Sequence, residues 1–219
     1  MVRLLALCGG FGMAACQWLI FAYAPTEATL GMAQKIFYLH LPLAWWGLVS
    51  FFVVFAASVT ALVRRSDAAD RLSQAACEIG VLLAVLTVVT GMFWARRSWG
   101  VWWTWDPRLS TALVMCFAYA ALLILRGLDM PHERRRQICA VTGIVAFLDV
   151  PLVFVSARIW RSIHPAVFAS KDGGLVPEMK YTAIACTICF GLLWLALLVW
   201  RNRQLACADR IEKLAGRGD

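Results

Sequence analysis

Charged side chains are scarce in this chain. Only 16% of its 219 residues are Asp, Glu, Lys or Arg, whereas 62% are hydrophobic. Soluble globular proteins carry about 25% charged residues, so this composition excludes an ordinary soluble enzyme or binding domain. The sequence also lacks a glycine-rich nucleotide-binding loop and a recognisable pairing of a nucleophile with a general base. These absences predict a protein that is not an enzyme, and nothing in the composition predicts a nucleic-acid partner.

Cysteine is present, but not in the patterns that most cysteine chemistry requires. The sequence has no C-x-x-C-H motif, so this chain is not itself a c-type haem acceptor. None of the eight cysteines falls in a predicted outer loop, where an oxidising compartment could pair them as disulfides. Cys186 and Cys189 are spaced to share one helix face, but inside an apolar run we interpret them as small hydrophobic residues.

Six long apolar runs account for most of the chain. A helix needs about 20 apolar residues to cross a bilayer, and the runs are continuous rather than alternating, which favours helices over a barrel. We therefore predict an all-α, polytopic membrane protein: one domain over residues 1–219, formed by a bundle of six transmembrane helices. The predicted spans are residues 4–23, 41–63, 76–95, 109–125, 138–157 and 181–200.

The distribution of Lys and Arg predicts the orientation of the bundle. Cations are more frequent in the loops on the side of the two termini, for example in Arg64, Arg65 and 134–136. By the positive-inside rule, both termini are predicted to be cytoplasmic. The outer loops still carry more cations than acids, Lys171 among them, which favours an anionic ligand on that side. Ordinary scatter of charge is the alternative.

A tryptophan-rich segment occupies the second predicted outer loop. Residues 94–105 contain five tryptophans. Interfacial tryptophan belts are common in membrane proteins, but belt residues are spread around a bundle, whereas these are packed in one stretch. We therefore predict an aromatic platform for a flat, apolar ligand with a charged edge. The predicted contact residues of this platform are Trp99, Gly100, Trp102, Trp103 and Trp105.

Charged residues adjoin this platform. Asp106 followed by Pro107 is a typical helix start, with Asp106 as the N-cap; we expect Asp106 to cap that helix or to orient Arg108. Arg108 and Lys35 are predicted at the same depth, where they could bind propionate carboxylates. Asp149 stands alone inside the fifth span beside Pro151, and the sequence leaves a structural and a functional role equally open.

Two of the three histidines lie at the predicted outer boundary. His40 is placed just ahead of the second span and His164 in the loop ahead of the sixth, whereas His132 falls in a polar inner turn. Two imidazoles from different loops can ligate haem iron from opposite sides, and Pro165 favours an extended conformation at His164. The alternative is that both histidines simply anchor helix ends at the interface.

These motifs resemble those of a known family. The stretch from Trp99 to Ser110 resembles the tryptophan-rich WGxWWxWDxRLT signature of haem-handling membrane proteins. Within this group, the chain is similar to the cytochrome c maturation protein C family, also called haem exporter protein C. Residues 38–42 and 160–165 resemble the family's two histidine segments, and residues 149–153 resemble the segment that leads to the second. The resemblance covers nearly the whole chain.

The resemblance implies a haem b site and a role for each residue in it. His40 and His164 would be the axial ligands, and residues 99–108 would hold the porphyrin edge at the outer membrane surface. Arg108 would face a propionate. Lys35 stands where the family often has an arginine, which weakens a propionate role there, and Ser110 replaces a usual threonine while keeping the hydroxyl.

The resemblance also implies a function in c-type cytochrome biogenesis. The protein would lie in the bacterial inner membrane and present haem on the periplasmic side to a small haem chaperone, cytochrome c maturation protein E. That chaperone bonds covalently to haem, and its release involves the ATP-binding cassette subunits A and B and the small membrane protein D.

Two other functions stay open. A subunit of a haem channel or of a cytochrome c haem ligase would share the tryptophan signature, but it usually has extra helices and further histidines. An electron-transfer cytochrome b subunit would need histidine pairs inside its spans, and the predicted spans contain no histidine.

Overall fold

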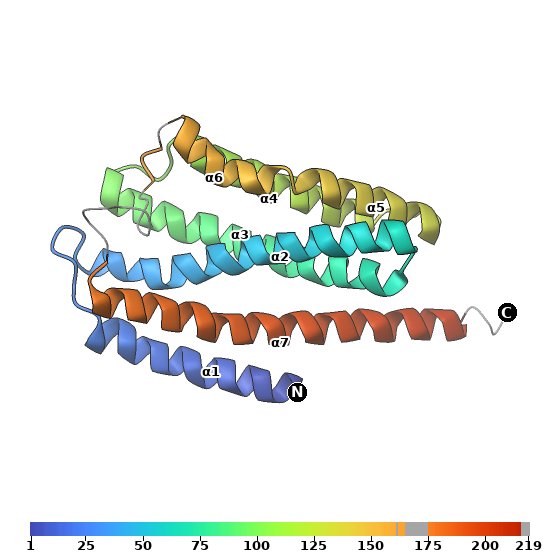
Figure 1. The fold of residues 1–219 in the computed structure, drawn as a ribbon, viewed down its shortest axis with the longest axis horizontal. Helices are drawn as coiled ribbons and strands as arrows, with labels where there is room; N and C mark the ends of the chain where they lie inside the picture. The colour runs from blue at the N-terminus through green and yellow to red at the C-terminus, as the bar shows by residue number, and fades with distance from the viewer. Residues whose placement is uncertain (161, 165–174, 216–219) are drawn as a thin grey trace.

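Helices form the structure, a computed structural model that describes residues 1–160, 162–164 and 175–215 (Figure 1). This described part of the chain contains no β-strand. Its helices are α1 Val2–Trp18, a π-helical turn Leu19–Tyr23, a 3-10 helix Met32–Ile36, α2 Phe37–Arg64, α3 Asp67–Trp99, α4 Pro107–Arg126, α5 His132–Ala146, α6 Asp149–Ile159 and α7 Pro177–Ala215. Residues Pro165 and Lys171, considered above, lie outside the described residues.

The structure confirms the all-α, multi-pass prediction. Six helical segments are long and apolar enough to cross a membrane. They are longer than the apolar runs because helical hydrogen bonding continues into polar sequence at each end. The α3 helix, for example, begins at Asp67 rather than near residue 76, since the Ser66 hydroxyl accepts a hydrogen bond from the Ala69 N–H and caps it. Only Arg65 and Ser66 separate α2 from α3.

The placement of His40 ahead of the second helix was wrong. The α2 helix begins at Phe37, so His40 lies in its first turn, and the preceding 3-10 helix carries Lys35. The predicted span began four residues later, because a hydropathy pattern detects the length of an apolar run and not hydrogen bonding. One consequence is that His40 is held on a helix and not on a loop.

The fifth span consists of two helices. The α5 helix ends at Ala146 and α6 begins at Asp149, with Pro151 in the first turn of α6. Proline has no N–H and cannot continue an α-helical ladder; the Phe147 carbonyl instead accepts a shorter-range bond from the Val150 N–H, at 3.1 Å. Among the described residues, Asp149 Oδ2 is buried without a hydrogen-bond partner.

The helices pack around an antiparallel pair, α2 and α3 (Figure 1). The α1 helix packs on α7 along one side of this pair. On the other side, α5 packs against α2, whereas α6 packs against α4. In the core, the Phe51 ring stacks on Tyr119 at 3.7 Å between ring centres. Because α6 packs against α4 and not against α2, the outer half of α2 is partly uncovered. A cavity lies there.

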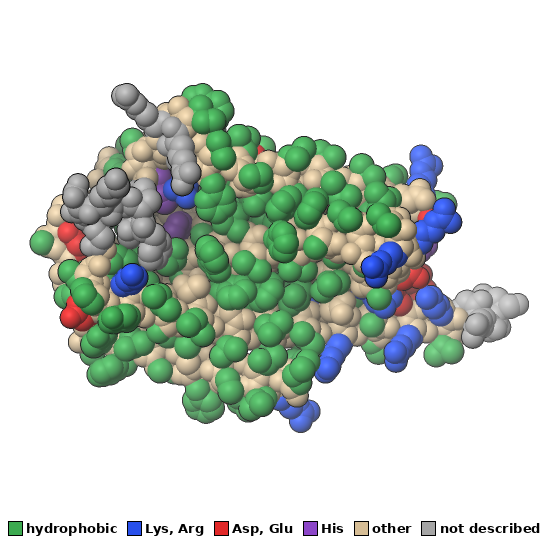
Figure 2. All heavy atoms as spheres, in the orientation of Figure 1, with side chains coloured by type: hydrophobic (Ala, Val, Ile, Leu, Met, Phe, Trp, Pro, Cys, Tyr) green, Lys and Arg blue, Asp and Glu red, His purple; other side chains and the backbone are tan. Residues whose placement is uncertain are grey.

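The two ends of the bundle differ in charge. Lys and Arg side chains gather at the end where α7 finishes (Figure 2), while His40 and His164 line a cavity at the opposite end. Buried and half-buried ion pairs stabilise the cationic end, among them Arg126 with Asp70 and Arg136 with Asp67. Both connections at that end, α2 to α3 and α4 to α5, are short.

We predict that Gly191→Ala destabilises the bundle. A Cβ at Gly191 of α7 would overlap the Trp46 indole, which donates to the Thr187 carbonyl at 2.8 Å and stacks on Trp194 at 4.7 Å. Overpacking of this kind costs about 1–3 kcal/mol. The midpoint of thermal unfolding in detergent should therefore fall. Gly10→Ala is the control, because a Cβ there meets nothing within 4 Å. Equal midpoints for the two variants would contradict this packing.

Candidate cofactor site

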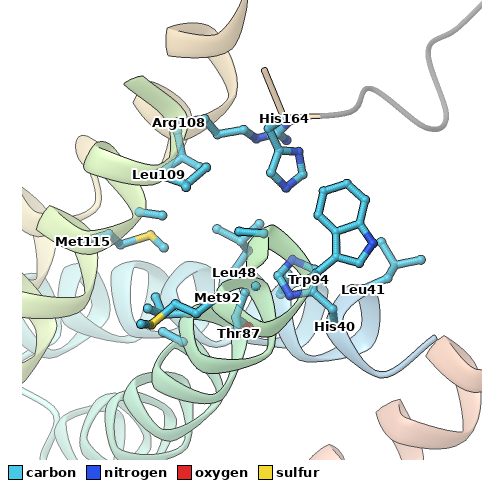
Figure 3. A pocket seen from close by; sticks show the side chains of 18 of the residues that line it. His40, Leu41, Leu48, Thr87, Met92, Trp94, Arg108, Leu109, Met115 and His164 are labelled. Atoms are coloured by element: carbon cyan, nitrogen blue, oxygen red, sulfur yellow. The ribbon is translucent and has the colours of Figure 1, made fainter. Parts of the chain in front are cut away.

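A cavity of about 540 Å³ opens at the end of the bundle opposite the cationic end. Side chains of α2, α3, α4 and α6, together with the segments that follow α3 and α6, form its walls. The walls are mainly apolar, with the polar groups His40, Arg108 and His164 facing the space (Figure 3). A concave, largely apolar cavity with a few convergent polar groups is the usual form of a cofactor site.

His40 and His164 lie on opposite sides of this cavity (Figure 3). Their ring centres are 6.4 Å apart and the ring planes differ by 33°. Two imidazoles that bind one metal ion from opposite sides, each about 2 Å from the metal, have ring centres about 6 Å apart. The observed spacing therefore leaves room for one metal atom between the rings.

The rest of the coordination sphere would have to come from a cofactor. In the described residues there is no cluster of three or more His, Cys, Asp or Glu side chains that could hold a metal ion. A metal bound by two opposed imidazoles alone would be poorly held. A planar macrocycle that supplies the remaining ligands fits this geometry, because it would occupy the apolar space between the two rings.

Asp106 ties the His164 segment to the start of α4. Its buried carboxylate accepts hydrogen bonds from the Arg108 N–H at 2.9 Å, the Ser162 hydroxyl at 2.8 Å and the Ile163 N–H at 2.8 Å. The Ser162 oxygen in turn accepts from the His164 N–H at 3.0 Å. Burial tends to raise the pKa of Asp106, but these hydrogen bonds outweigh it and hold the pKa below its usual value.

The predicted N-cap role of Asp106 is therefore confirmed, since Asp106 caps α4. The same carboxylate has a second use that the sequence did not reveal. It holds in place the segment that carries His164, more than fifty residues further along the chain, and does not itself line the cavity.

Three of the predicted platform tryptophans line the cavity, namely Trp99, Trp102 and Trp103. Trp94 lines it as well, and its ring meets Trp99 edge-on at 5.6 Å. Trp105 does not line it: its side chain is 78% exposed, although its ring lies 6.0 Å from Trp103. Gly100 is also outside the lining; it ends α3 in a left-handed conformation with φ 76°, which favours glycine.

The two predicted cations are separated by the structure. Arg108 faces the cavity beside His164 (Figure 3), with its guanidinium carbon 5.9 Å from the centre of the Phe154 ring. Lys35 does not line the cavity. Its ammonium group donates to the Ile20 and Ala24 carbonyls, each at 2.6 Å, at the end of the first span.

The position of Lys35 has a simple geometric cause. Lys35 and His40 are five residues apart in consecutive helices, and about 3.6 residues complete one turn of an α-helix. The two side chains therefore project from different faces. Lys35 stabilises the carbonyl end of the first span, a site where a cation is favourable, and we leave it out of the cofactor site.

Apolar residues of α3 and α4 also line the cavity, and no sequence motif marks them. The lining residues of α3 recur at three- and four-residue intervals, as on one face of a helix, but the pattern does not tell which face meets a cavity. Leu109, Met92 and Met115 also face the space (Figure 3). The lining set from α3 includes Ala84, Thr87, Val88, Gly91, Met92, Trp94 and Ala95.

We predict that Asp106→Ala releases the His164 segment. Hydrogen bonds to a charged group contribute about 1.5–3 kcal/mol, so amide hydrogen exchange at Ile163 should accelerate by roughly tenfold or more. Since the pKa of Asp106 is lowered, its contribution is complete above the ordinary value of 3.8 and is lost only as the pH falls through the lowered pKa. Wild-type exchange at Ile163 should therefore show no carboxyl-linked change between pH 5 and 8.

The matched control is Glu27→Ala. Glu27 also accepts backbone N–H bonds, from Thr29 at 2.9 Å and from Leu30, but in the loop after the first span. Its removal should leave exchange at Ile163 unchanged. Protection of Ile163 that persists without the Asp106 carboxylate would rule out the tether.

Comparison with known proteins shows the family of this chain. A family model described as "Heme exporter protein C" matches residues 1–216. The relative of that name from Bradyrhizobium diazoefficiens is 33% identical over 192 residues, which cover 84% of this chain and 72% of the relative. The relative from Rhodobacter capsulatus is 28% identical over 200 residues, covering 90% and 83%. The relative from Escherichia coli K12 is 27% identical over 185 residues, covering 84% and 75%. This chain therefore belongs to the haem exporter protein C family.

Proposed function

We propose that this protein binds haem b at the outer end of its bundle and presents it for c-type cytochrome biogenesis. The observation that carries the proposal is the opposed pair His40 and His164, with ring centres 6.4 Å apart across an apolar cavity. In this proposal the imidazoles of His40 and His164 would hold the iron. Haem would supply a reactive group at its periphery, to which a chaperone can bond covalently.

The cavity walls fit the two kinds of surface that haem presents. The indoles of Trp99, Trp102 and Trp103 offer aromatic faces and edges to the porphyrin. Arg108 supplies a cation beside His164, and a guanidinium can bind a propionate carboxylate through two hydrogen bonds. Asp106 acts indirectly, since it holds the His164 segment and caps the helix that carries Arg108.

The charge asymmetry supports the proposed orientation of the site. The cationic end of the bundle, where α7 finishes, is the end that the positive-inside rule assigns to the cytoplasm (Figure 2). With both termini cytoplasmic, the histidine end lies on the periplasmic side of the bacterial inner membrane. Haem held there is accessible to a periplasmic protein.

The proposed recipient is the small periplasmic haem chaperone, cytochrome c maturation protein E. Trp105 supports a protein partner at the cavity mouth, because its large apolar side chain is exposed next to the lining residue Trp103. Release of the loaded chaperone is proposed to involve the ATP-binding cassette subunits A and B and the small membrane protein D. This chain supplies binding and orientation in that complex, and we assign it no catalytic residue.

An electron-transfer cytochrome b function has less support. Such a subunit stacks haems across the bilayer between several histidine pairs. The sequence has one further histidine, His132, which begins α5 at the cationic end. A haem channel or a haem ligase subunit would likewise be expected to carry further histidines within the spans.

The histidine pair makes the first functional prediction. The purified protein should bind haem with a six-coordinate, low-spin spectrum. In the His40→Ala, His164→Ala double variant, the low-spin signal should disappear and bound haem should fall below about a tenth, since no axial ligand remains. His132→Ala is the matched control and should keep the wild-type spectrum. A double variant that folds normally and retains low-spin haem would refute the assignment.

Transfer to the chaperone makes the second prediction. When the haem-loaded protein and the candidate chaperone are reconstituted together, haem should become covalently attached to the chaperone and resist extraction with acidified organic solvent. Trp105→Ala should slow this transfer while leaving haem binding within about twofold, because Trp105 is exposed and contributes to partner contact. Transmembrane electron flow without attachment would favour the cytochrome b function instead.

A further inference from the structure

A hydroxyl group on α3 contacts the imidazole of His40. Thr90 Oγ1 lies 3.0 Å from His40 Nδ1. Thr90 does not line the cavity and belongs neither to the tryptophan segment nor to a histidine motif. Thr90 therefore contacts the His40 ring on a side that does not face the cavity.

The hydrogen bonds around Thr90 favour His40 Nδ1 as the donor. Its hydroxyl oxygen lies 2.8 Å from the Leu86 carbonyl and 3.1 Å from the Thr87 carbonyl. Both carbonyls can only accept, and a threonine hydroxyl has a single hydrogen to donate. When that hydrogen goes to the backbone, the hydroxyl oxygen accepts from His40 Nδ1. His40 then carries its proton on Nδ1, and Nε2 keeps a free lone pair.

The next residue on α3 restricts the same ring by contact. A Cβ at Gly91 would lie 3.2 Å from His40 Cε1 and 3.7 Å from His40 Nδ1. The imidazole therefore packs against the bare backbone of α3 at Gly91. Thr90 and Gly91 act on one ring together, the first by a directed hydrogen bond and the second by allowing close approach.

We propose that Thr90 is a positioning residue for the haem ligand His40: it fixes the Nδ1–H tautomer and the ring orientation, so that Nε2 is offered to the iron. This proposal rests on the proposed function, since it assumes that His40 ligates haem. Ligating histidines commonly donate their second N–H to an acceptor that fixes their tautomer and raises their basicity, and loss of that acceptor costs about 10–100-fold in metal affinity.

The direction of the electronic effect also follows. An imidazole that donates a hydrogen bond from Nδ1 is a stronger electron donor at Nε2 and stabilises ferric iron. Without the Thr90 oxygen, the ring gains rotational freedom, can take the other tautomer and donates less strongly. Haem affinity should fall, and the reduction potential of the bound haem should rise.

The experiment compares Thr90→Val with Thr90→Ser in the full chain in lipid nanodiscs. Valine keeps the volume and removes the acceptor, whereas serine keeps the acceptor. Haem is titrated into each apo-protein, and the midpoint potential of the bound haem is measured. We expect Thr90→Val to weaken haem binding about tenfold and to raise the potential, and Thr90→Ser to stay within about twofold of the wild type. Gly91→Ala, which displaces the ring, should also weaken binding.

Thr60→Val is the matched control. Thr60 makes the same intrahelical bond, to the Ala56 carbonyl at 2.8 Å, but is remote from the cavity. The Thr60→Val variant should bind haem with the same affinity as the wild type. Equal affinity and potential in Thr90→Val and the wild type would overturn the positioning role, as would a serine variant as weak as the valine variant. Haem binding by the wild type that does not depend on His40 would instead overturn the proposed function itself.

Discussion

The need to satisfy every backbone hydrogen bond in hydrocarbon governs the shape of this protein. Helices meet that need internally, so irregular backbone is confined to the ends of the bundle, where water or side chains can take over. At the outer end, the segment after α6 leaves helical structure next to an apolar cavity. The carboxylate of Asp106 accepts the Ile163 N–H there, while Ser162 accepts the His164 N–H. Presentation of one histidine therefore depends on a carboxylate at the start of a different helix.

The fifth span is divided beside the cavity. Its first helix, α5, packs against α2, whereas its second helix, α6, packs against α4. Residues of α2, α4 and α6 together line the cavity. His40 lies in the first turn of α2, at the outer rim of that space. Pro151, which interrupts the ladder, does not line the cavity.

Much of this organisation could be predicted from the sequence. Apolar length alone gives six spans, and Asp106 followed by Pro107 gives the start of α4, because both signals are local. The pairing of His40 with His164 could be expected once both were placed at the same end of the bundle. Their ligand role stays a proposal.

Other features depend on how helices rotate and pack, which no local pattern encodes. Lys35 was expected near Arg108 from its depth in the membrane, but helix rotation directs it to the carbonyls that end the first span. Trp105 was grouped with its neighbours by sequence, yet the turn that follows α3 leaves it exposed. Thr90 gave no signal at all, because its importance lies in a contact between α2 and α3.

The two histidines are attached to the protein in unequal ways. His40 belongs to a continuous helix and contacts a second one, whereas the segment that carries His164 is tied to the start of α4 through Asp106. If a ligand is held between the two rings, its position on one side depends on the contact between α2 and α3, and its position on the other side depends on the start of α4.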